Sequence, residues 1–298
     1  MIVAKNVSKS FEGVKALKDV SLNVEKGSVY GLVGSNGAGK TTLLKLLSGI
    51  YKQDNGEIYI DDSEVYENID IKSDIIFMPD TLYFFAQYTI KEMAKFYKRI
   101  YTNWNEGRFK KLEEVFNINT NKRINSLSKG MQRQVAFWLS LSTMPKIMIL
   151  DEPVDGLDPV MRKKVKNLII QDVAEREMTV FISSHNLREL EDICDHIGIL
   201  HKGNMIIQKD LDDLKSDVHK IQVAFDEIPK ELLGNIDVLY KEERGSVALL
   251  IVRGKKETII SNFEKYEPKI LDVLPLTLEE IFIYEMGGIG YEIENIIV

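Results

Sequence analysis

The residues Gly34-Ser35-Asn36-Gly37-Ala38-Gly39-Lys40-Thr41 decide the fold of this 298-residue chain. They match the pattern G-x-x-x-x-G-K-[S/T] at every specified position. Backbone N–H groups can surround a triphosphate only where no side chains crowd the loop, and the glycines meet that need. A helix predicted directly after the loop would direct its positive N-terminal end at the same anion. The stretch therefore predicts a nucleotide-binding site.

The neighbours of this loop argue against a chance match. The apolar run Val29 to Val33 predicts a strand before it, and Thr41 to Gly49 has a helical pattern after it. A glycine-rich turn that matched by accident would need neither neighbour. Lys40 is predicted to reach the terminal phosphates, and the Thr41 hydroxyl to ligate Mg²⁺. The other residues predicted to bind ATP lie in the loop or just after it: Gly34, Ser35, Asn36, Gly37, Ala38, Gly39 and Thr42.

A second polar site is predicted where an apolar strand ends. Residues Ile147 to Leu150 are followed directly by Asp151 and Glu152. Ligands of parallel sheets bind at the carboxyl ends of the strands, so both carboxylates would face the nucleotide. Asp151 suits the Mg²⁺ site, and Glu152 suits a general base that polarises an attacking water. The alternative is a strand end that is merely solvated, which is common for a lone Asp-Glu pair but less so beside a phosphate loop.

Apolar patterning predicts an α/β fold for most of the chain. Short strands are predicted before the phosphate loop, at Ile2 to Val7, Val20 to Val24 and Val29 to Val33, and again at Val180 to Ser183 and Ile197 to Leu200. Between about residues 84 and 145, apolar residues recur at helical spacing instead. We therefore predict a domain over residues 1–214 with a parallel sheet, interrupted by a helical subdomain at about 84–145.

The remaining residues, 215–298, predict a small α+β domain. Strands are expected at Ile221 to Phe225, Ile236 to Tyr240, Val247 to Val252 and Lys269 to Leu274, and helices near Lys230 to Leu233 and Lys255 to Tyr266. The order strand-helix-strand-strand-helix-strand is typical of a split βαβ, ferredoxin-like sandwich. A last helix is expected to begin at Thr277, with Glu280 completing a capping box.

Composition excludes several classes of protein. Cys194 is the single cysteine, so no intrachain disulfide can form. The N-terminus lacks the apolar core of a signal peptide, and polar residues interrupt the most apolar stretch, so we expect a cytoplasmic protein that does not cross a membrane alone. The net charge of −7 disfavours a nucleic-acid partner, and none is expected.

Three further segments carry a resemblance to one family. Leu127-Ser128-Lys129-Gly130-Met131-Gln132 resembles the signature motif of ABC ATPases. Asp155-Gly156-Leu157-Asp158-Pro159 resembles the D-loop of that family, and Ser183-Ser184-His185 resembles its switch-histidine segment. With the phosphate loop and the acidic strand, five motifs occur in the family's order within about residues 1–214. The chain is therefore similar to the ATP-binding subunits of ABC transporters. The resemblance implies a P-loop NTPase fold with a RecA-like parallel sheet core, an N-terminal antiparallel β subdomain and a helical subdomain.

The resemblance also implies how the motifs work together. In this family two subunits sandwich two ATP molecules head to tail, so Ser128, Lys129 and Gly130 would contact the nucleotide held by the partner chain. Asp158 would act in the D-loop at the same interface. His185 would hold the γ-phosphate and the attacking water, and the catalytic set is Glu152, His185 and Lys40. A lone histidine is more often structural, but its position after two serines at a strand end favours the functional role.

Departures from the family's pattern and one aromatic residue complete the predicted site. Lys129 and Met131 replace the first glycine and the glutamine of the signature, and Asp80 stands at the position of the Q-loop glutamine. An ionised carboxylate there could approach Mg²⁺ but could not donate a hydrogen bond. Pro79 followed by a carboxylate resembles ATPases of the ABC-2 type, many of them exporters, as does the C-terminal extension. Phe11 falls where the family stacks a ring on adenine; the alternative is a core residue.

The predicted activity is ATP hydrolysis that powers transport through a separate permease, with ATP and Mg²⁺ as cofactors. The partners would be a second ATP-binding subunit, identical or different, and a permease that holds the protein at the inner face of the membrane. Tyr83, Phe84, Phe85 and Tyr88 are expected either to receive a permease helix or to form the core of the subdomain. A soluble ABC protein acting on DNA or ribosomes is disfavoured, because the chain has one cassette and no long coiled coil. A P-loop kinase would leave the signature, D-loop and switch histidine unexplained.

Overall fold

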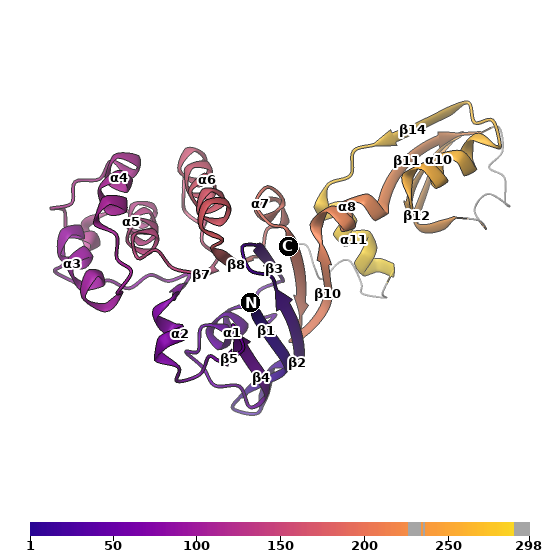
Figure 1. The fold of residues 1–298 in the computed structure, drawn as a ribbon. Coiled ribbons are helices and arrows are strands. Elements are labelled where there is room, and N and C mark those ends of the chain that lie inside the picture. The colour runs from indigo at the N-terminus through magenta and orange to yellow at the C-terminus, as the bar shows by residue number, and fades with distance from the viewer. Residues whose placement is uncertain (226–233, 235, 289–298) are drawn as a thin grey trace. The chain divides into compact units, whose positions relative to one another are not determined.

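The computed structural model describes residues 1–225, 234 and 236–288, shown as a ribbon in Figure 1. Contacts between residues divide the chain into two compact units. The first unit comprises Met1–Asn186 and Ile193–Gln208, and the second comprises Leu187–Asp192 and Lys209–Val298.

A six-stranded sheet forms the centre of the first unit, with the order β10-β9-β3-β8-β7-β6. The pairs β9-β3, β3-β8, β8-β7 and β7-β6 are all parallel. Every residue of β3 and of β7 is buried, as expected for strands covered on both faces. The strands are β3 (Val29–Val33), β6 (Ile75–Met78), β7 (Ile147–Asp151), β8 (Thr179–Ser184), β9 (His196–His201) and β10 (Asn204–Asp210).

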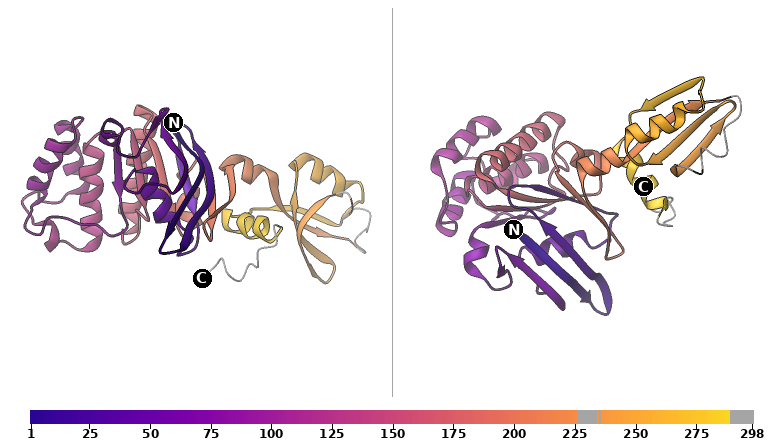
Figure 2. Two further views of the ribbon diagram at one scale, coloured as in Figure 1. Left: turned by 90° about the horizontal axis from the view of Figure 1, so that it is seen from below. Right: turned by 45° about the vertical axis from the view of Figure 1, so that its right-hand side comes forward.

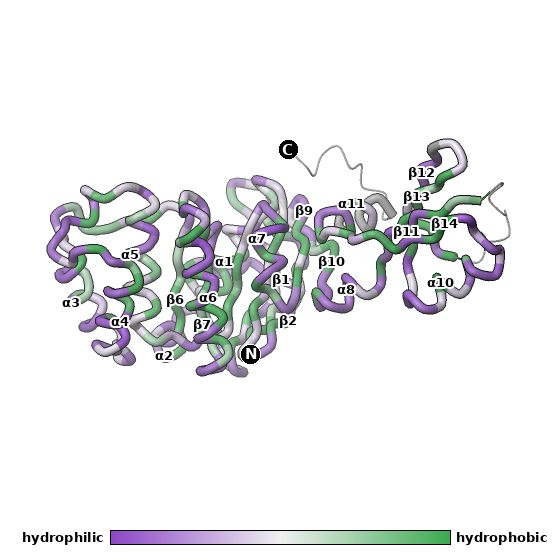
Figure 3. Tube along the Cα trace, turned by 90° about the horizontal axis from the view of Figure 1, so that it is seen from above, coloured by the Kyte–Doolittle hydropathy of each residue, from purple (hydrophilic) through white to green (hydrophobic). Residues whose placement is uncertain are grey.

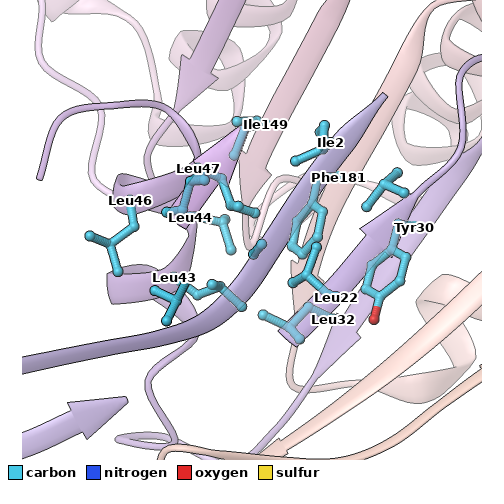
Figure 4. Close-up of a cluster of buried hydrophobic side chains, with 14 of the residues drawn as sticks. Ile2, Leu22, Tyr30, Leu32, Leu43, Leu44, Leu46, Leu47, Ile149 and Phe181 are labelled. Atoms are coloured by element: carbon cyan, nitrogen blue, oxygen red, sulfur yellow. The ribbon is translucent and has the colours of Figure 1, made fainter. Parts of the chain in front are cut away.

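An antiparallel sheet with the order β2-β1-β4-β5 packs near the central sheet. Its strands are β1 (Ile2–Phe11), β2 (Val14–Val24), β4 (Asn55–Ile60) and β5 (Ser63–Glu64). Apolar residues of β1 and β2 share a core with α1 (Lys40–Leu47) and with the central strands, as Figure 4 shows. In that core Tyr30 stacks on Phe181, with ring centroids 4.9 Å apart. The helix that follows the phosphate loop is thereby fixed from two sides.

Three helices make up the inserted helical subdomain: α3 (Ile90–Ile100), α4 (Glu106–Phe116) and α5 (Lys129–Ser142). Figure 2 shows them side by side at one end of the first unit. Trp138 is fully buried among them, stacks on Phe109 at 4.8 Å and donates its indole N–H to the carbonyl of Phe109. Figure 3 shows α5 as hydrophobic along much of its length, in keeping with its buried C-terminal half.

The described residues of the first unit form three further helical elements. They are α2 (Ile69–Ser73), the 3₁₀ helix η1 (Ile124–Ser126) and α6 (Pro159–Arg176). The expected α/β class is confirmed, with a parallel central sheet, an N-terminal antiparallel sheet and an inserted group of helices. Among the described residues, no helix combines the length and the apolar character that a membrane span requires.

The second unit contains a four-stranded antiparallel sheet with the order β12-β13-β11-β14. Thr277 and Glu280 form the predicted capping box, since the Thr277 hydroxyl accepts from the Glu280 N–H while the Glu280 carboxylate accepts from the Thr277 N–H. The helix predicted at residues 230–233 lies outside the described residues. The elements are α7 (Leu187–Glu191), α8 (Leu211–Asp217), β11 (Val218–Ala224), β12 (Asp237–Arg244), β13 (Val247–Arg253), α10 (Lys256–Glu264), β14 (Ile270–Leu274) and α11 (Leu278–Gly288).

Candidate active site

The phosphate loop joins the end of β3 to the start of α1. Gly39 caps this helix with a left-handed backbone, at φ 110°. A Cβ atom at Gly39 would lie 2.6 Å from the carbonyl oxygen of Ala16, so both the conformation and the space require glycine. The first N–H groups of α1 therefore face the pocket, where an anion can accept from them.

Lys40 is almost fully buried beneath the loop, with 7% of its surface exposed. Its ammonium donates to the carbonyl of Gly34 at 2.6 Å and lies 3.3 Å from Oε1 of Glu152. A buried ammonium needs acceptors for its three donors, and a phosphate oxygen would supply another. The lysine is thus placed between the loop and the end of β7.

The carboxylate of Asp151 is fixed by two hydroxyl groups. The Thr41 hydroxyl donates to Oδ2 at 2.7 Å, and the Ser183 hydroxyl donates to Oδ1 at 2.6 Å. Asp151 is only 3% exposed, and its neighbours come from α1 and β8. The result is an all-oxygen group at the floor of the pocket, which is the donor type that Mg²⁺ prefers.

Glu152 has a left-handed backbone, with φ 48°, which is uncommon for a residue other than glycine. Its N–H donates to the carbonyl and the hydroxyl of Ser183, both at 3.2 Å. Its Oε2 accepts from the backbone N–H of His185 at 3.2 Å and lies 2.9 Å from Nδ1 of that histidine. Glu152 therefore stands between Lys40 on one side and His185 on the other.

One pocket of about 290 Å³ gathers most of the predicted residues. Phosphate-loop residues and both strand-end carboxylates line it together with Asp80. Gly34 and Ala38 belong to the loop but do not line this pocket, and neither does Phe11. The lining residues are Ala16, Ser35, Asn36, Gly37, Gly39, Lys40, Thr41, Thr42, Asp80, Asp151 and Glu152.

The signature and D-loop residues lie outside that pocket. Ser128 is the N-cap of α5 and accepts from the N–H of Met131 at 3.3 Å. Gly130 faces the D-loop, because a Cβ atom on it would lie 2.6 Å from the carbonyl oxygen of Gly156. Asp158 caps α6 by accepting from the two N–H groups of Val160 and Met161, each at 3.0 Å. These motifs are thus held by hydrogen bonds within the chain, and their residues do not line the pocket of that chain.

The structure shows which of Phe11 and the aromatic cluster Tyr83, Phe84, Phe85 and Tyr88 are exposed and which are buried. Phe11 is 40% exposed and contacts Tyr51 edge to face, so it is not a core residue. Within the cluster Tyr83 is 85% exposed, whereas Phe84 is buried. The cluster therefore contains an exposed residue that could contact a permease helix, Tyr83, and a residue of the subdomain core, Phe84.

Four residues at or beside the site have no role assigned from the sequence. Ala16 lines the pocket from β2, and its residue type suggests no ligand. Ser183 and Asp155 lie in recognised motifs without an assigned role. Asp155 places a carboxylate oxygen within 4.8 Å of ligand atoms on Glu152 and His185. Arg133, on α5, donates to two pocket residues, Glu152 and Asp80.

A phosphate loop and acidic strand ends at the carboxyl edge of a parallel sheet define a P-loop nucleotide-binding protein. The sequence profile of the ABC transporter family matches residues 17–155. The chain is 35% identical over 288 residues to the ABC transporter ATP-binding protein YtrB of Bacillus subtilis (strain 168), covering 97% of this chain and 99% of that one. It is also 32% identical to the bacitracin transport ATP-binding protein BcrA of Bacillus licheniformis, over 72% of this chain and 71% of that one.

Solved structures with a similar fold are also ABC transporter cassettes. The dimeric structure of MJ0796, a bacterial ABC transporter cassette, matches with a TM-score of 0.65 and 26% identity, over 71% of this chain and 99% of that one. A structure of the same cassette described as a post-hydrolysis state bound to ADP and Pi matches with a TM-score of 0.64 and 25% identity, over 71% and 99%. The chain belongs to the ABC transporter family as an ATP-binding protein. It is an ATPase that powers transport through a permease.

Proposed function

We propose that two copies of this chain form a head-to-tail dimer that hydrolyses ATP at two composite sites and drives export of a substrate through a separate permease. The pairing of Glu152 with both Lys40 and His185 at the edge of the phosphate pocket carries this proposal. A single chain supplies every half-site motif, so a second copy is sufficient to complete both sites. The export direction rests on the resemblance to ABC-2 systems.

Each residue of the proposed site has a role that its position supports. The buried ammonium of Lys40 would neutralise the terminal phosphates, and Phe11, exposed at the end of β1, would stack on adenine. Thr41 and Asp151 would hold Mg²⁺, which supplies charge neutralisation on the phosphates. Glu152 would accept a proton from the attacking water, and His185 would orient that water beside it.

The signature residues would complete the site of the partner chain. Ser128 caps α5, so the same helix end can present N–H groups and a hydroxyl to a γ-phosphate. Lys129 would add positive charge there, and Asp158 would hold the D-loop at the interface between the chains. Neither the signature residues nor Asp158 line the pocket of their own chain, which supports a role at the nucleotide of the partner chain.

Glu152→Gln tests the role of the base. Glutamine keeps the side-chain size and an acceptor oxygen but cannot take a proton, so ATP turnover should fall by about 10²-fold or more while ATP binding is retained. The variant should accumulate as an ATP-bound dimer, measured by light scattering with and without ATP. Turnover within about twofold of the wild-type rate would remove Glu152 from this role.

We further propose that the permease contacts the exposed part of the aromatic cluster at the inner face of the membrane. Tyr83, Phe85 and Tyr88 are 85%, 40% and 37% exposed, and Phe85 contacts Tyr88 at 4.9 Å between ring centroids. Such a surface suits an apolar helix. Replacing Tyr83 by serine should abolish transport in reconstituted vesicles while the isolated subunit keeps its basal ATPase rate. An equal loss of both activities would contradict the contact.

A further inference from the structure

Arg133 is a buried arginine that connects the signature helix to the phosphate pocket. It lies one turn into α5, only 8% exposed. Its Nη1 donates to the carbonyl of Glu152 at 2.5 Å, and its Nη2 donates to the carbonyl of Asp80 at 2.6 Å and to Oδ1 of Asp80 at 3.1 Å. Both acceptor residues line the pocket, whereas Arg133 does not.

The geometry of these contacts requires arginine. A guanidinium carries donors in a rigid fork, so one side chain can serve two main-chain carbonyls that face it from different segments. A lysine ammonium is a point charge on a flexible stem and does not reproduce that fork. The carboxylate of Asp80 supplies the counter-charge that a buried cation needs, and that carboxylate is itself 56% exposed.

The contact with Glu152 acts on a backbone that is held in an unusual conformation. Glu152 has φ 48°, and its N–H is held by Ser183 on β8. Arg133 holds the carbonyl on the other side of the same residue. The direction of the Glu152 side chain, and therefore its distance to Lys40 and His185, depends on this backbone being fixed.

We propose that Arg133 is a positioning residue for hydrolysis. From the signature helix α5 it holds the backbone of Glu152 and of Asp80 in the positions that the reaction needs. This inference rests on the proposed role of Glu152 as the base. Because Ser128 caps the helix that carries Arg133, a nucleotide bound at the signature of one chain would be linked through a few residues to the base in the pocket of that same chain. Asp80 and Arg133 form a pair in which the carboxylate accepts from the guanidinium, so Asp80 has a partner other than a metal ion.

The main test is Arg133→Lys, measured by steady-state ATPase kinetics and by binding of a fluorescent ATP analogue. Misplacing the base should lower kcat by about tenfold to 10²-fold, with KM and the analogue's Kd within about twofold of the wild-type values. A kcat within about twofold of wild type, or a loss confined to KM, would overturn the inference.

A matched control is available in a second, partly buried arginine that also pairs with a carboxylate. Arg108 on α4 donates to Asp172 on α6 at 2.7 Å and makes no contact with the pocket residues. Arg108→Lys should therefore lower the melting temperature without changing kcat. If Arg108→Lys lowers kcat as much as Arg133→Lys does, the effect is one of general stability and the inference is wrong.

A second variant covers the case in which Arg133→Lys does not fold. Asp80→Asn removes the counter-charge but leaves the main-chain carbonyl that Arg133 contacts, so it should lower kcat by a smaller factor, about threefold to tenfold. In the Glu152→Gln background it should leave the ATP-dependent dimer unchanged, because Arg133 acts through the base. Loss of that dimer would overturn the inference. Normal turnover of Glu152→Gln alone would instead overturn the proposed base.

Discussion

At the scale of single residues, the site depends on a few buried groups that hold one another in place. Lys40 contacts Gly34 and Glu152, and Asp151 is held by Thr41 and Ser183. The contacts of Lys40 with Glu152 and of Thr41 with Asp151 join the start of α1 to the end of β7, and the contact of Ser183 with Asp151 joins β8 to β7. Moving any one of these groups leaves a buried polar atom without its partner, which is costly in the interior of a protein.

Ser128 offers a residue-scale prediction that separates helix capping from phosphate contact. Asparagine and aspartate are both good N-caps, so Ser128→Asn and Ser128→Asp should each keep the melting temperature within a few degrees. The aspartate adds a negative charge where the γ-phosphate of the partner's nucleotide is proposed to lie. ATPase rates should therefore fall by about 10²-fold or more in Ser128→Asp and much less in Ser128→Asn. Equal rates in the two variants would place the phosphate elsewhere.

At the scale of elements, α3 shows how a local motif sets the start of a helix. Thr89 and Glu92 form a capping box, in which the Thr89 N–H and hydroxyl both donate to the Glu92 carboxylate at 2.8 Å. Both hydrogen bonds lower the pKa of Glu92 from its ordinary value; the bond from the Thr89 N–H has the larger effect and the bond from its hydroxyl the smaller. Because the pKa of Glu92 is lower in the folded state than in the unfolded state, the ionised carboxylate stabilises the fold. This stabilisation is fully present at pH values above the pKa of the unfolded state, and it is lost as the pH falls through the pKa of the folded state.

Glu92→Gln tests this capping box. The variant should be less stable than the wild type near pH 7, and the difference should shrink as pH falls below about 4. Trp104 and Trp138, the only tryptophans, both lie in the helical subdomain, so their fluorescence during urea unfolding reports on this part. Glu280→Gln, in the capping box of α11, serves as the control and should leave the tryptophan transition unchanged. A difference for Glu92→Gln that stays constant with pH would contradict the assignment.

At the scale of the whole molecule, the sequence predicts those features whose residues are neighbours along the chain. Strand, glycine loop and helix are contiguous from Val29 to Leu47, so the phosphate loop and its placement could be predicted. The contacts of Arg133 could not, because its partners Glu152 and Asp80 lie 19 and 53 residues away along the chain. Ala16 likewise reaches the pocket only through the folding of β2 against the loop. Such contacts depend on tertiary packing, which leaves no local pattern in the sequence.

Sharing of each active site between two chains is the central claim, and a mixing experiment tests it most directly. A Lys40→Ala chain lacks a working phosphate loop, and a Ser128→Asp chain lacks a working signature, so each homodimer should hydrolyse ATP at about 1% of the wild-type rate or less. In the mixed dimer, the intact loop of one chain meets the intact signature of the other, which restores one of the two sites. Mixing the purified chains should therefore raise the ATPase rate many-fold above that of either chain alone. A mixture no more active than the sum of its two components would contradict the shared site.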